Sequence, residues 1–152
     1  MRIVLDTNIL VRANIKARGP SREILLTIGH GSDILISSPF LLRETERALA
    51  YPRLQKLWRL TAQDIQEHVD LIEKISCLVQ PVVKIPVVLG DPNDDPVVYT
   101  AVAGEADVLC TLDQHFFEPD VARFAQSHHI RILTDVQLLA ELRKRRLRVS
   151  RL

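Results

Sequence analysis

The stretch that decides the fold is RIVLDTN at residues 2–8. Its run from Ile3 to Leu5 is short, continuous and rich in β-branched residues, the pattern of a strand buried on both faces. Asp6 follows this run directly. Longer helical patterns separate it from further short apolar runs, at residues 33–37, 108–111 and 130–134. Strands that alternate with helices predict an α/β domain with a mostly parallel central sheet.

Capping signals mark where the predicted helices begin. A Ser, Thr or Asp side chain at a helix start accepts a hydrogen bond from a free backbone N–H, and proline suits the first helical position. On these signals we expect helices at 21–29 capped by Ser21, from Pro39 to about Ala50 capped by Ser38, after Thr61, at 96–104 capped by Asp95, at 121–127 and at 136–146. Residues 78–83 form a possible strand, which Pro81 would confine to an edge or break.

Length and composition describe one ordinary globular domain. A chain of 152 residues, 47% hydrophobic and 26% charged, can bury one core and is not typical of a disordered protein. The two cysteines, Cys77 and Cys110, form no CxxC pair, which argues against a disulfide scaffold or zinc ribbon and favours a reducing compartment. No apolar stretch approaches the roughly 20 residues that span a bilayer, and no signal peptide precedes the first strand. We therefore expect a cytoplasmic protein with no membrane association.

The charge of the chain is unevenly distributed. The net charge is +1, but residues 143–152 (RKRRLRVSRL) carry six basic groups and no acid, so removing them leaves residues 1–142 at −5. We accordingly divide the chain into a domain at 1–142 and a basic tail at 143–152. The tail could contact RNA or an acidic partner, or it could only complement the dipole of the last helix. The candidate RNA-binding residues are Arg143, Lys144, Arg145 and Arg146.

Acidic side chains follow the predicted strands at separate places in the sequence. Asp6 follows the first strand, Asp113 follows the strand at 108–111, and the loop GDPNDDP at 90–96 enters a helix through Asp95. Glu44 comes from the helix after the second strand. Because parallel α/β sheets bind ligands at the carboxyl ends of their strands, these acids are candidates for one site.

Each acid taken alone has an ordinary structural explanation, because Asp commonly caps helices and Glu commonly lies on a solvated helix face. Together, carboxylates without a counter-cation repel one another and raise one another's pKa. A hard divalent cation removes that cost, and ligands that are all oxygen select Mg²⁺ or Mn²⁺. Such an ion binds phosphate oxygens and lowers the pKa of water, as phosphodiester hydrolysis requires.

Several other kinds of site find no support in the sequence. It contains neither the GxxxxGK[ST] phosphate loop nor the GxSxG elbow, and the pair His128-His129 is better explained as surface than as a zinc site. A phosphoacceptor receiver domain would have a Lys after the last strand, where Thr134 and Asp135 stand. A haloacid-dehalogenase-type phosphatase would have a second Asp in place of Asn8.

The acidic pattern resembles that of PIN-domain nucleases. It consists of DTN at 6–8, Glu44, DPNDD at 91–95 and TLD at 111–113. The likeness runs almost end to end and is closest to the toxin components of bacterial and archaeal toxin–antitoxin pairs, which are relatives of the VapC toxins. It also covers GPSREIL at 19–25, SPFLLRETERAL at 38–49, LTAQDIQEHVDLIEKI at 60–75, ADVLCTLD at 106–113 and RILTDVQLLAEL at 131–142.

The resemblance implies a three-layer α/β/α domain and a metal-dependent endoribonuclease, a phosphodiester hydrolase that cuts single-stranded or structured RNA with metal-activated water. It implies that Mg²⁺ or Mn²⁺ is held by four catalytic acids, Asp6, Glu44, Asp95 and Asp113, where Asp95 is preferred to Asp94 because it stands at the mouth of the helix. It also implies supporting polar roles for Thr7, Asn8 and Thr111. The sequence departs from this subgroup at Leu112, where Gly is common, and at Asp135, where Pro is common.

The resemblance further implies a homodimer and a cognate antitoxin. One observation on the residues points the same way, because the segment 41–58 holds more large apolar residues than a solvated surface needs. We expect part of this set to be core and Trp58 to be an interface anchor. The residues are Leu41, Leu42, Leu49, Tyr51, Leu54, Leu57 and Trp58. The alternative is a catalytically silent PIN-fold binding module that acts through a protein partner.

Overall fold

The computed structural model describes residues 1–81 and 95–152. In this part of the chain five strands form one all-parallel sheet in the order β3-β2-β1-β4-β5. The strands are β1 (Arg2–Leu5), β2 (Ile34–Ser37), β3 (Ser76–Leu78), β4 (Val108–Cys110) and β5 (Arg131–Leu133). The predicted α/β class with a parallel sheet is confirmed.

Strand β1 lies at the centre of the sheet because its residues are apolar on both faces. Ile3 pairs with Leu35 of β2 on one side and with Val108 of β4 on the other. The side chain of Ile3 has no exposed surface. A strand whose residues after Arg2 are all apolar fits where both faces and both edges are covered.

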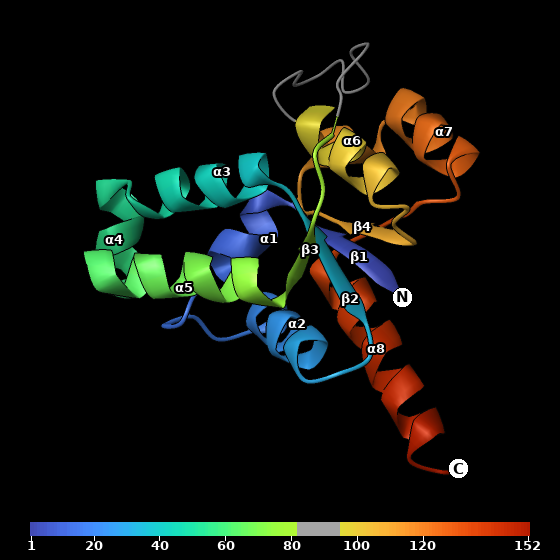
Figure 1. The fold of residues 1–152 in the computed structure, drawn as a ribbon, viewed down its shortest axis with the longest axis horizontal. Coiled ribbons are helices and arrows are strands. Elements are labelled where there is room, and N and C mark those ends of the chain that lie inside the picture. The colour runs from blue at the N-terminus through green and yellow to red at the C-terminus, as the bar shows by residue number, and fades with distance from the viewer. Residues whose placement is uncertain (82–94) are drawn as a thin grey trace.

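Helices cover both faces of the sheet (Figure 1). They are α1 (Thr7–Arg12), α2 (Pro20–Gly29), α3 (Pro39–Leu49), α4 (Pro52–Trp58), α5 (Ala62–Ile75), α6 (Asp95–Ala103), α7 (Pro119–Ser127) and α8 (Asp135–Val149), with the short 3₁₀ helix η2 (Gln114–Phe117). Helices α2 and α8, which pack against each other, lie on one face, and α6 and α7 lie on the other. The three-layer arrangement is therefore confirmed.

The C-terminal end of α6 packs closely against strand β2. A Cβ added to Gly104, at the end of α6, would collide with the side chain of Ile36 in β2. Only glycine lets the helix end come this near to the strand. The close contact between the C-terminal end of α6 and strand β2 thus depends on one small residue.

Several predicted helix starts are confirmed, and others are corrected. Ser38 caps α3, and Thr61 caps α5 in a reciprocal arrangement with Asp64. The prediction that Ser21 caps a helix is wrong, because α2 begins at Pro20 after Gly19 and the Ser21 hydroxyl donates instead to Asp135 Oδ2, 3.0 Å away. Tertiary packing of α2 on α8 offers that hydroxyl a buried carboxylate.

Two predicted boundaries also move. The strand expected at 78–83 lies earlier, at Ser76–Leu78 of β3, so Pro81 follows it; positions 82 and 83 lie outside the described residues. The last helix continues past the predicted 146 to Val149. It therefore contains most of the segment that the sequence assigned to a tail.

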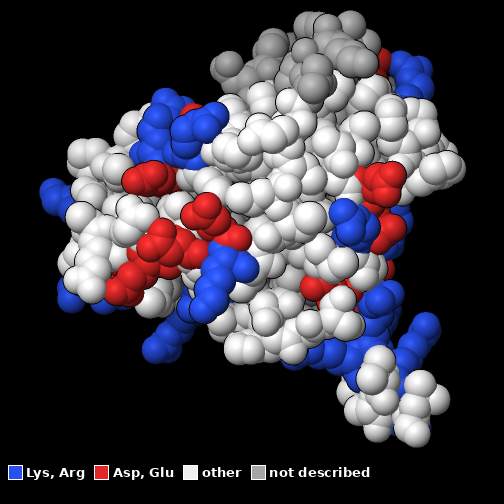
Figure 2. All heavy atoms as spheres, in the orientation of Figure 1, with Lys and Arg blue, Asp and Glu red and all other residues white. Residues whose placement is uncertain are grey.

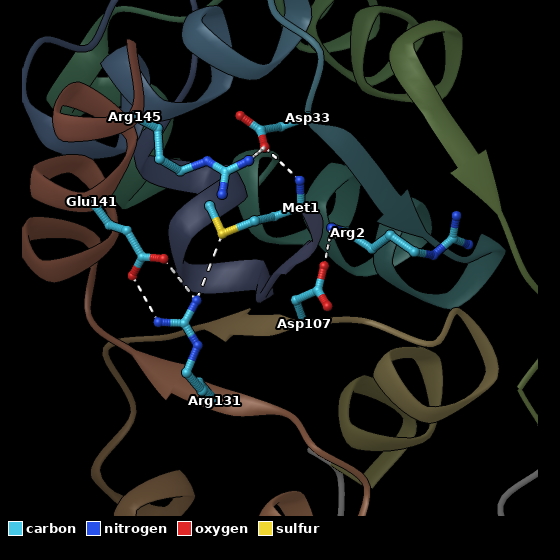
Figure 3. Close-up of polar contacts among 7 residues, drawn as sticks. All are labelled: Met1, Arg2, Asp33, Asp107, Arg131, Glu141 and Arg145. Carbon is cyan, nitrogen blue, oxygen red and sulfur yellow. Dashed lines mark hydrogen bonds and ion pairs between the residues drawn. The ribbon is translucent and has the colours of Figure 1, made fainter. Parts of the chain in front are cut away.

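Ion pairs join the amino ends of the strands to neighbouring segments (Figure 3). The amino group of Met1 lies 2.6 Å from Asp33 Oδ1, before β2. Arg131, the first residue of β5, makes two hydrogen bonds of 2.8 Å to Glu141 of α8. These contacts tie α8 to the amino edge of the sheet.

Part of the apolar set in segment 41–58 belongs to the core, as expected, and other members lie at the surface. Leu41, Leu42 and Leu49 are buried, and Trp58 is half-buried against a second small core made by Val11, Leu49, Leu60 and Ile65. Tyr51 and Leu57 are 52% and 66% exposed. No helix among the described residues is long and apolar enough to cross a membrane.

Candidate active site

The carboxyl ends of β1 and β4 bring two of the predicted acids together. Leu5 and Cys110 are paired across these neighbouring strands, and the backbone N–H of Asp6 donates to the Cys110 carbonyl at 2.9 Å. Asp6 is also the N-cap of α1. Because β4 ends in the same register, Thr111 and then Asp113 leave it beside Asp6.

Thr111 connects the two acids by hydrogen bonds. Its hydroxyl donates to Asp6 Oδ2 at 2.7 Å, and its Oγ1 accepts the backbone N–H of Asp113 at 3.0 Å. Its side chain is completely buried. A buried hydroxyl that both donates and accepts fixes the two segments relative to each other.

Asn8 joins the same two segments from the other side. Its Nδ2 donates to Asp6 Oδ2 at 3.0 Å, and its Oδ1 accepts the backbone N–H of Leu112 at 3.2 Å. The hydrogen bond from Leu112 to Asn8 thus fixes the turn that positions Asp113, although Leu112 stands where glycine is more common. Of Thr7, it is the backbone N–H that takes part, with a bond of 2.6 Å to Asp6 Oδ1.

The carboxyl of Asp6 has a pKa of about 6, well above its ordinary 3.8. Burial is the largest cause, and the charge of Asp113 raises the pKa further. Hydrogen bonds from Thr111, from the N–H of Thr7 and from Asn8 act in the opposite direction and do not fully compensate. A nearby cation would relieve this unfavourable charge.

Asp113 is the more open of the two acids, with 28% of its side chain exposed. It caps η2, because its Oδ1 accepts the N–H of His115 at 3.0 Å. The ring Nδ1 of His115 also lies 3.3 Å from that oxygen, although not in hydrogen-bonding geometry. Sequence reasoning missed His115, whose only signal is its position two residues after the TLD motif.

The donor set of Asp6 and Asp113 suits a hard divalent cation. A carboxylate has about four lone-pair positions, of which Asp6 uses three for the donors described above. Oδ2 of Asp113 makes no hydrogen bond with any described residue. Free carboxylate oxygens beside a buried acid of raised pKa are the ligands that Mg²⁺ and Mn²⁺ take in proteins.

Glu44 lies on α3, the helix that follows β2, and outside this hydrogen-bond network. Its Oε2 accepts from Arg47, one turn further along α3, at 2.7 Å. Asp95 is the first residue of α6, but its side chain is not among those described, and Asp91 and Asp94 lie outside the described residues. Within the described part of the chain, no three acidic, His or Cys side chains gather closely enough to hold one ion.

Comparison with known proteins assigns the chain to a family. Residues 2–115 match the sequence model described as PIN domain. The chain belongs to the PIN-domain family. The matched segment includes Asp6, Glu44 and Asp113, and ends just after the turn that carries Asp113.

A solved structure has a similar fold. The chain is similar to one in the crystal structure of VapBC2 from Rickettsia felis bound to a DNA fragment from their promoter. The TM-score is 0.55 at 17% identity, over 87% of this chain and 98% of that chain. At this identity the likeness concerns the fold. No match was found among curated protein sequences.

One buried acid of this PIN domain was not predicted as part of any site. Asp135, the first residue of α8, is 8% exposed and accepts from the Ser21 hydroxyl and from the N–H of Val136. Burial is the main cause that raises the pKa of Cys110, and the charge of Asp135 adds to it. This thiol is therefore unsuited to act as a nucleophile.

The predicted RNA-binding residues lie away from the acids. Helix α8 starts after β5, at the carboxyl edge of the sheet, and runs back past the amino edge, where Arg145 lies 3.8 Å from Asp33 (Figure 3). Arg143, Lys144 and Arg146 belong to the same two turns. The structure thus brings together Asp6, Thr7, Asn8, Thr111 and Asp113, and places the basic residues at the other edge.

Proposed function

We propose that this PIN domain is a Mg²⁺- or Mn²⁺-dependent endoribonuclease that cleaves single-stranded or structured RNA, and that it is the toxin of a toxin–antitoxin pair. The observation that carries the proposal is the buried Asp6, whose raised pKa and nearby Asp113 leave a negative site that a cation would stabilise. Family membership supports the nuclease class.

The cation would be held by Asp6 and Asp113, completed by Glu44 and Asp95. When bound, it would supply Lewis-acid stabilisation of phosphate oxygens and a water of lowered pKa. Thr111 and Asn8 would keep the Asp6 carboxylate oriented, since both donate to its Oδ2. Hydrogen bonds from neighbouring side chains to metal ligands are typical of metal sites, where they orient the ligands and affect metal affinity.

Glu44 would enter the site from α3, where its present partner is Arg47. Breaking that exposed ion pair would cost little, because surface pairs contribute little to stability. Arg47 would then lose its partner, and its positive charge would be available for RNA phosphate.

The test is cleavage of a labelled single-stranded RNA by purified protein with Mn²⁺, with EDTA and with variants of α3. We expect cleavage with Mn²⁺, none with EDTA, and a loss of at least tenfold in Glu44→Gln. Glu46→Gln is the matched control, an exposed acid two residues away on the same helix, and should cleave like the parent. A protein that is inactive with every divalent ion but still captures a partner would instead support a silent binding module.

We also propose a homodimer and a protein antitoxin as partners. The similarity to VapBC2 and to the VapC toxins supports the antitoxin. Trp58, expected to be the interface anchor, packs partly against the small core, so the exposed Tyr51, the N-cap of α4, and Leu57 within α4 would make the apolar contact. Light scattering at tens of micromolar should give twice 17.3 kDa for the parent and a lower mass for Leu57→Ser. A parent particle of 17.3 kDa would contradict the dimer.

A further inference from the structure

The six basic residues of segment 143–152 divide into two sets with different surroundings. The inner set is tied to the body of the protein. Arg143 makes a bidentate pair with Glu23 of α2, Arg145 pairs with Asp33, and Arg146 donates to the Thr27 carbonyl. These three residues therefore fasten α8 to α2 and to the amino edge of the sheet.

The outer set consists of Lys144, Arg148 and Arg151, which have no ion pair or side-chain hydrogen bond with any described residue. Their spacing of four and three residues puts them in one row along the helix. Lys144 lies about 200° around the axis from the buried Leu142, because each residue turns the helix by about 100°. Arg151 follows the C-cap Ser150, whose helical backbone continues the turn.

This row faces solvent on a part of α8 that extends beyond the rest of the molecule. Figure 1 shows the end of the helix leaving the body, and Figure 2 shows Lys and Arg gathered over it. The charge of Lys144 helps to lower the pKa of Glu141, but that carboxylate is held by two hydrogen bonds from Arg131. The outer row thus presents positive charge that the described part of the protein leaves uncompensated.

We propose that Lys144, Arg148 and Arg151 form a second RNA contact, which holds the backbone of a single-stranded substrate away from the cleavage site. The proposal rests on the nuclease function proposed above. A linear row of cations complements the regular charge of a phosphodiester backbone, and arginine suits phosphate oxygens in particular. RNA is favoured over an acidic protein because the acidic site, in a body of charge −5, needs a separate positive surface to retain a polyanion.

The distance between the two contacts has a consequence for substrate length. From Asp135 to Arg148 the helix rises about 20 Å, at about 1.5 Å per residue. A stacked strand rises about 3.4 Å per nucleotide, so about six stacked nucleotides cover this distance, and an extended strand needs fewer. A long RNA can therefore use both contacts, whereas a dinucleotide at the acidic site cannot.

The experiment compares two triple variants that remove the same charge. The outer variant is Lys144→Gln/Arg148→Gln/Arg151→Gln, and the inner control is Arg143→Gln/Arg145→Gln/Arg146→Gln. Both are made in an Asp6→Asn background, and binding of a 30-nucleotide single-stranded RNA is measured by anisotropy in EDTA across a series of salt concentrations. Binding does not require cleavage, so an inactive parent would overturn the nuclease proposal without deciding this one.

We expect the outer variant to flatten the slope of log affinity against log salt by about 2 for the long RNA, at about 0.7 per lost contact. The inner control should melt at a lower temperature but keep the slope. An unchanged slope in the outer variant, or equal slopes in both variants, would overturn the proposal. So would an outer variant that loses binding to an acidic peptide while its RNA slope is kept, because the face would then be a protein-docking surface.

Discussion

The two edges of the sheet both carry buried or half-buried acids, and they differ in how those acids are compensated. At the amino edge Asp33 is paired with the amino group of Met1 and with Arg145, and Glu141 with Arg131 (Figure 3). The Arg131 contact lowers the pKa of Glu141. At the carboxyl edge neither Asp6 nor Asp113 is paired with a described Lys or Arg, and the pKa of Asp6 is raised to about 6.

This difference separates acids that stabilise the fold from acids that are available for chemistry. An acid satisfied by an internal cation gains nothing from an added metal ion. An acid whose charge is buried beside another carboxylate is stabilised by an added metal ion. Acids with shifted pKa values of this kind are typical of functional sites. The predictions below compare equivalent changes at the two edges.

The largest effect is expected for cleavage. Asp6→Asn should lower the rate of RNA cleavage by at least about 100-fold, since even outer-sphere changes at metal sites cost 10- to 100-fold. Asp33→Asn at the amino edge should retain the parent rate at a temperature where it is folded. Equal losses in both variants, measured with repurified protein, would erase the distinction between the edges.

Thr111 should tune the site without being a ligand. Thr111→Val removes the hydrogen bond that contributes most to lowering the pKa of Asp6, so that pKa should rise and Mn²⁺ affinity should fall about 10- to 100-fold near pH 6. Because the proton competes with the metal, the loss should shrink as the pH is raised to 8. Calorimetric titration at the two pH values checks this, and a loss independent of pH would indicate a purely structural role.

Removing the charge of Asp6 should stabilise the metal-free protein. The folded state keeps its proton up to about pH 6 and the unfolded chain releases it near 3.8, so the free energy of unfolding falls as the pH rises between these values. At pH 7.5 Asp6→Asn should gain roughly 1–3 kcal/mol, since one pKa unit corresponds to about 1.4 kcal/mol and the amide gives up an acceptor position. Urea unfolding in EDTA measures this gain.

Two controls belong to that measurement. Mn²⁺ should raise the melting temperature of the parent and should not raise that of Asp6→Asn. The variant should also lack the decline of stability between pH 4 and 6. An apo variant less stable than the parent at pH 7.5 would contradict the assignment of Asp6 as an uncompensated acid.

The smallest effect is expected at the amino edge. Glu141→Gln should lower the free energy of unfolding by less than about 1 kcal/mol, because the Arg131 side chain is 52% exposed and solvent screens the pair. The pKa of Glu141 is lowered in the folded state. The stability that this ion pair adds is therefore present at neutral pH and is lost as the pH falls through the lowered pKa of Glu141. A loss that stays constant down to pH 2 would point to packing instead of charge.

Much of the fold followed from local patterns in the sequence. The run Ile3–Leu5 specified a central strand because it is apolar on both faces, and Ser38 and Thr61 specified helix starts because their hydroxyls cap free N–H groups. Asp6 and Asp113 could be placed at one edge because parallel strands end together. The sequence could not place Glu44 against Arg47, because the orientation of an exposed side chain depends on its neighbours in space.

The sequence by itself therefore determined the α/β class, the strand ends and the two acids that follow them, since each depends on residues close together along the chain. Only the tertiary structure decided how strongly Asp6 is perturbed, because Thr111 lies 105 positions away and meets it through the register of β1 and β4. It also decided that α8 carries its basic residues to the opposite edge. The direction of a helix over the sheet is set by packing against α2, and no local pattern encodes it.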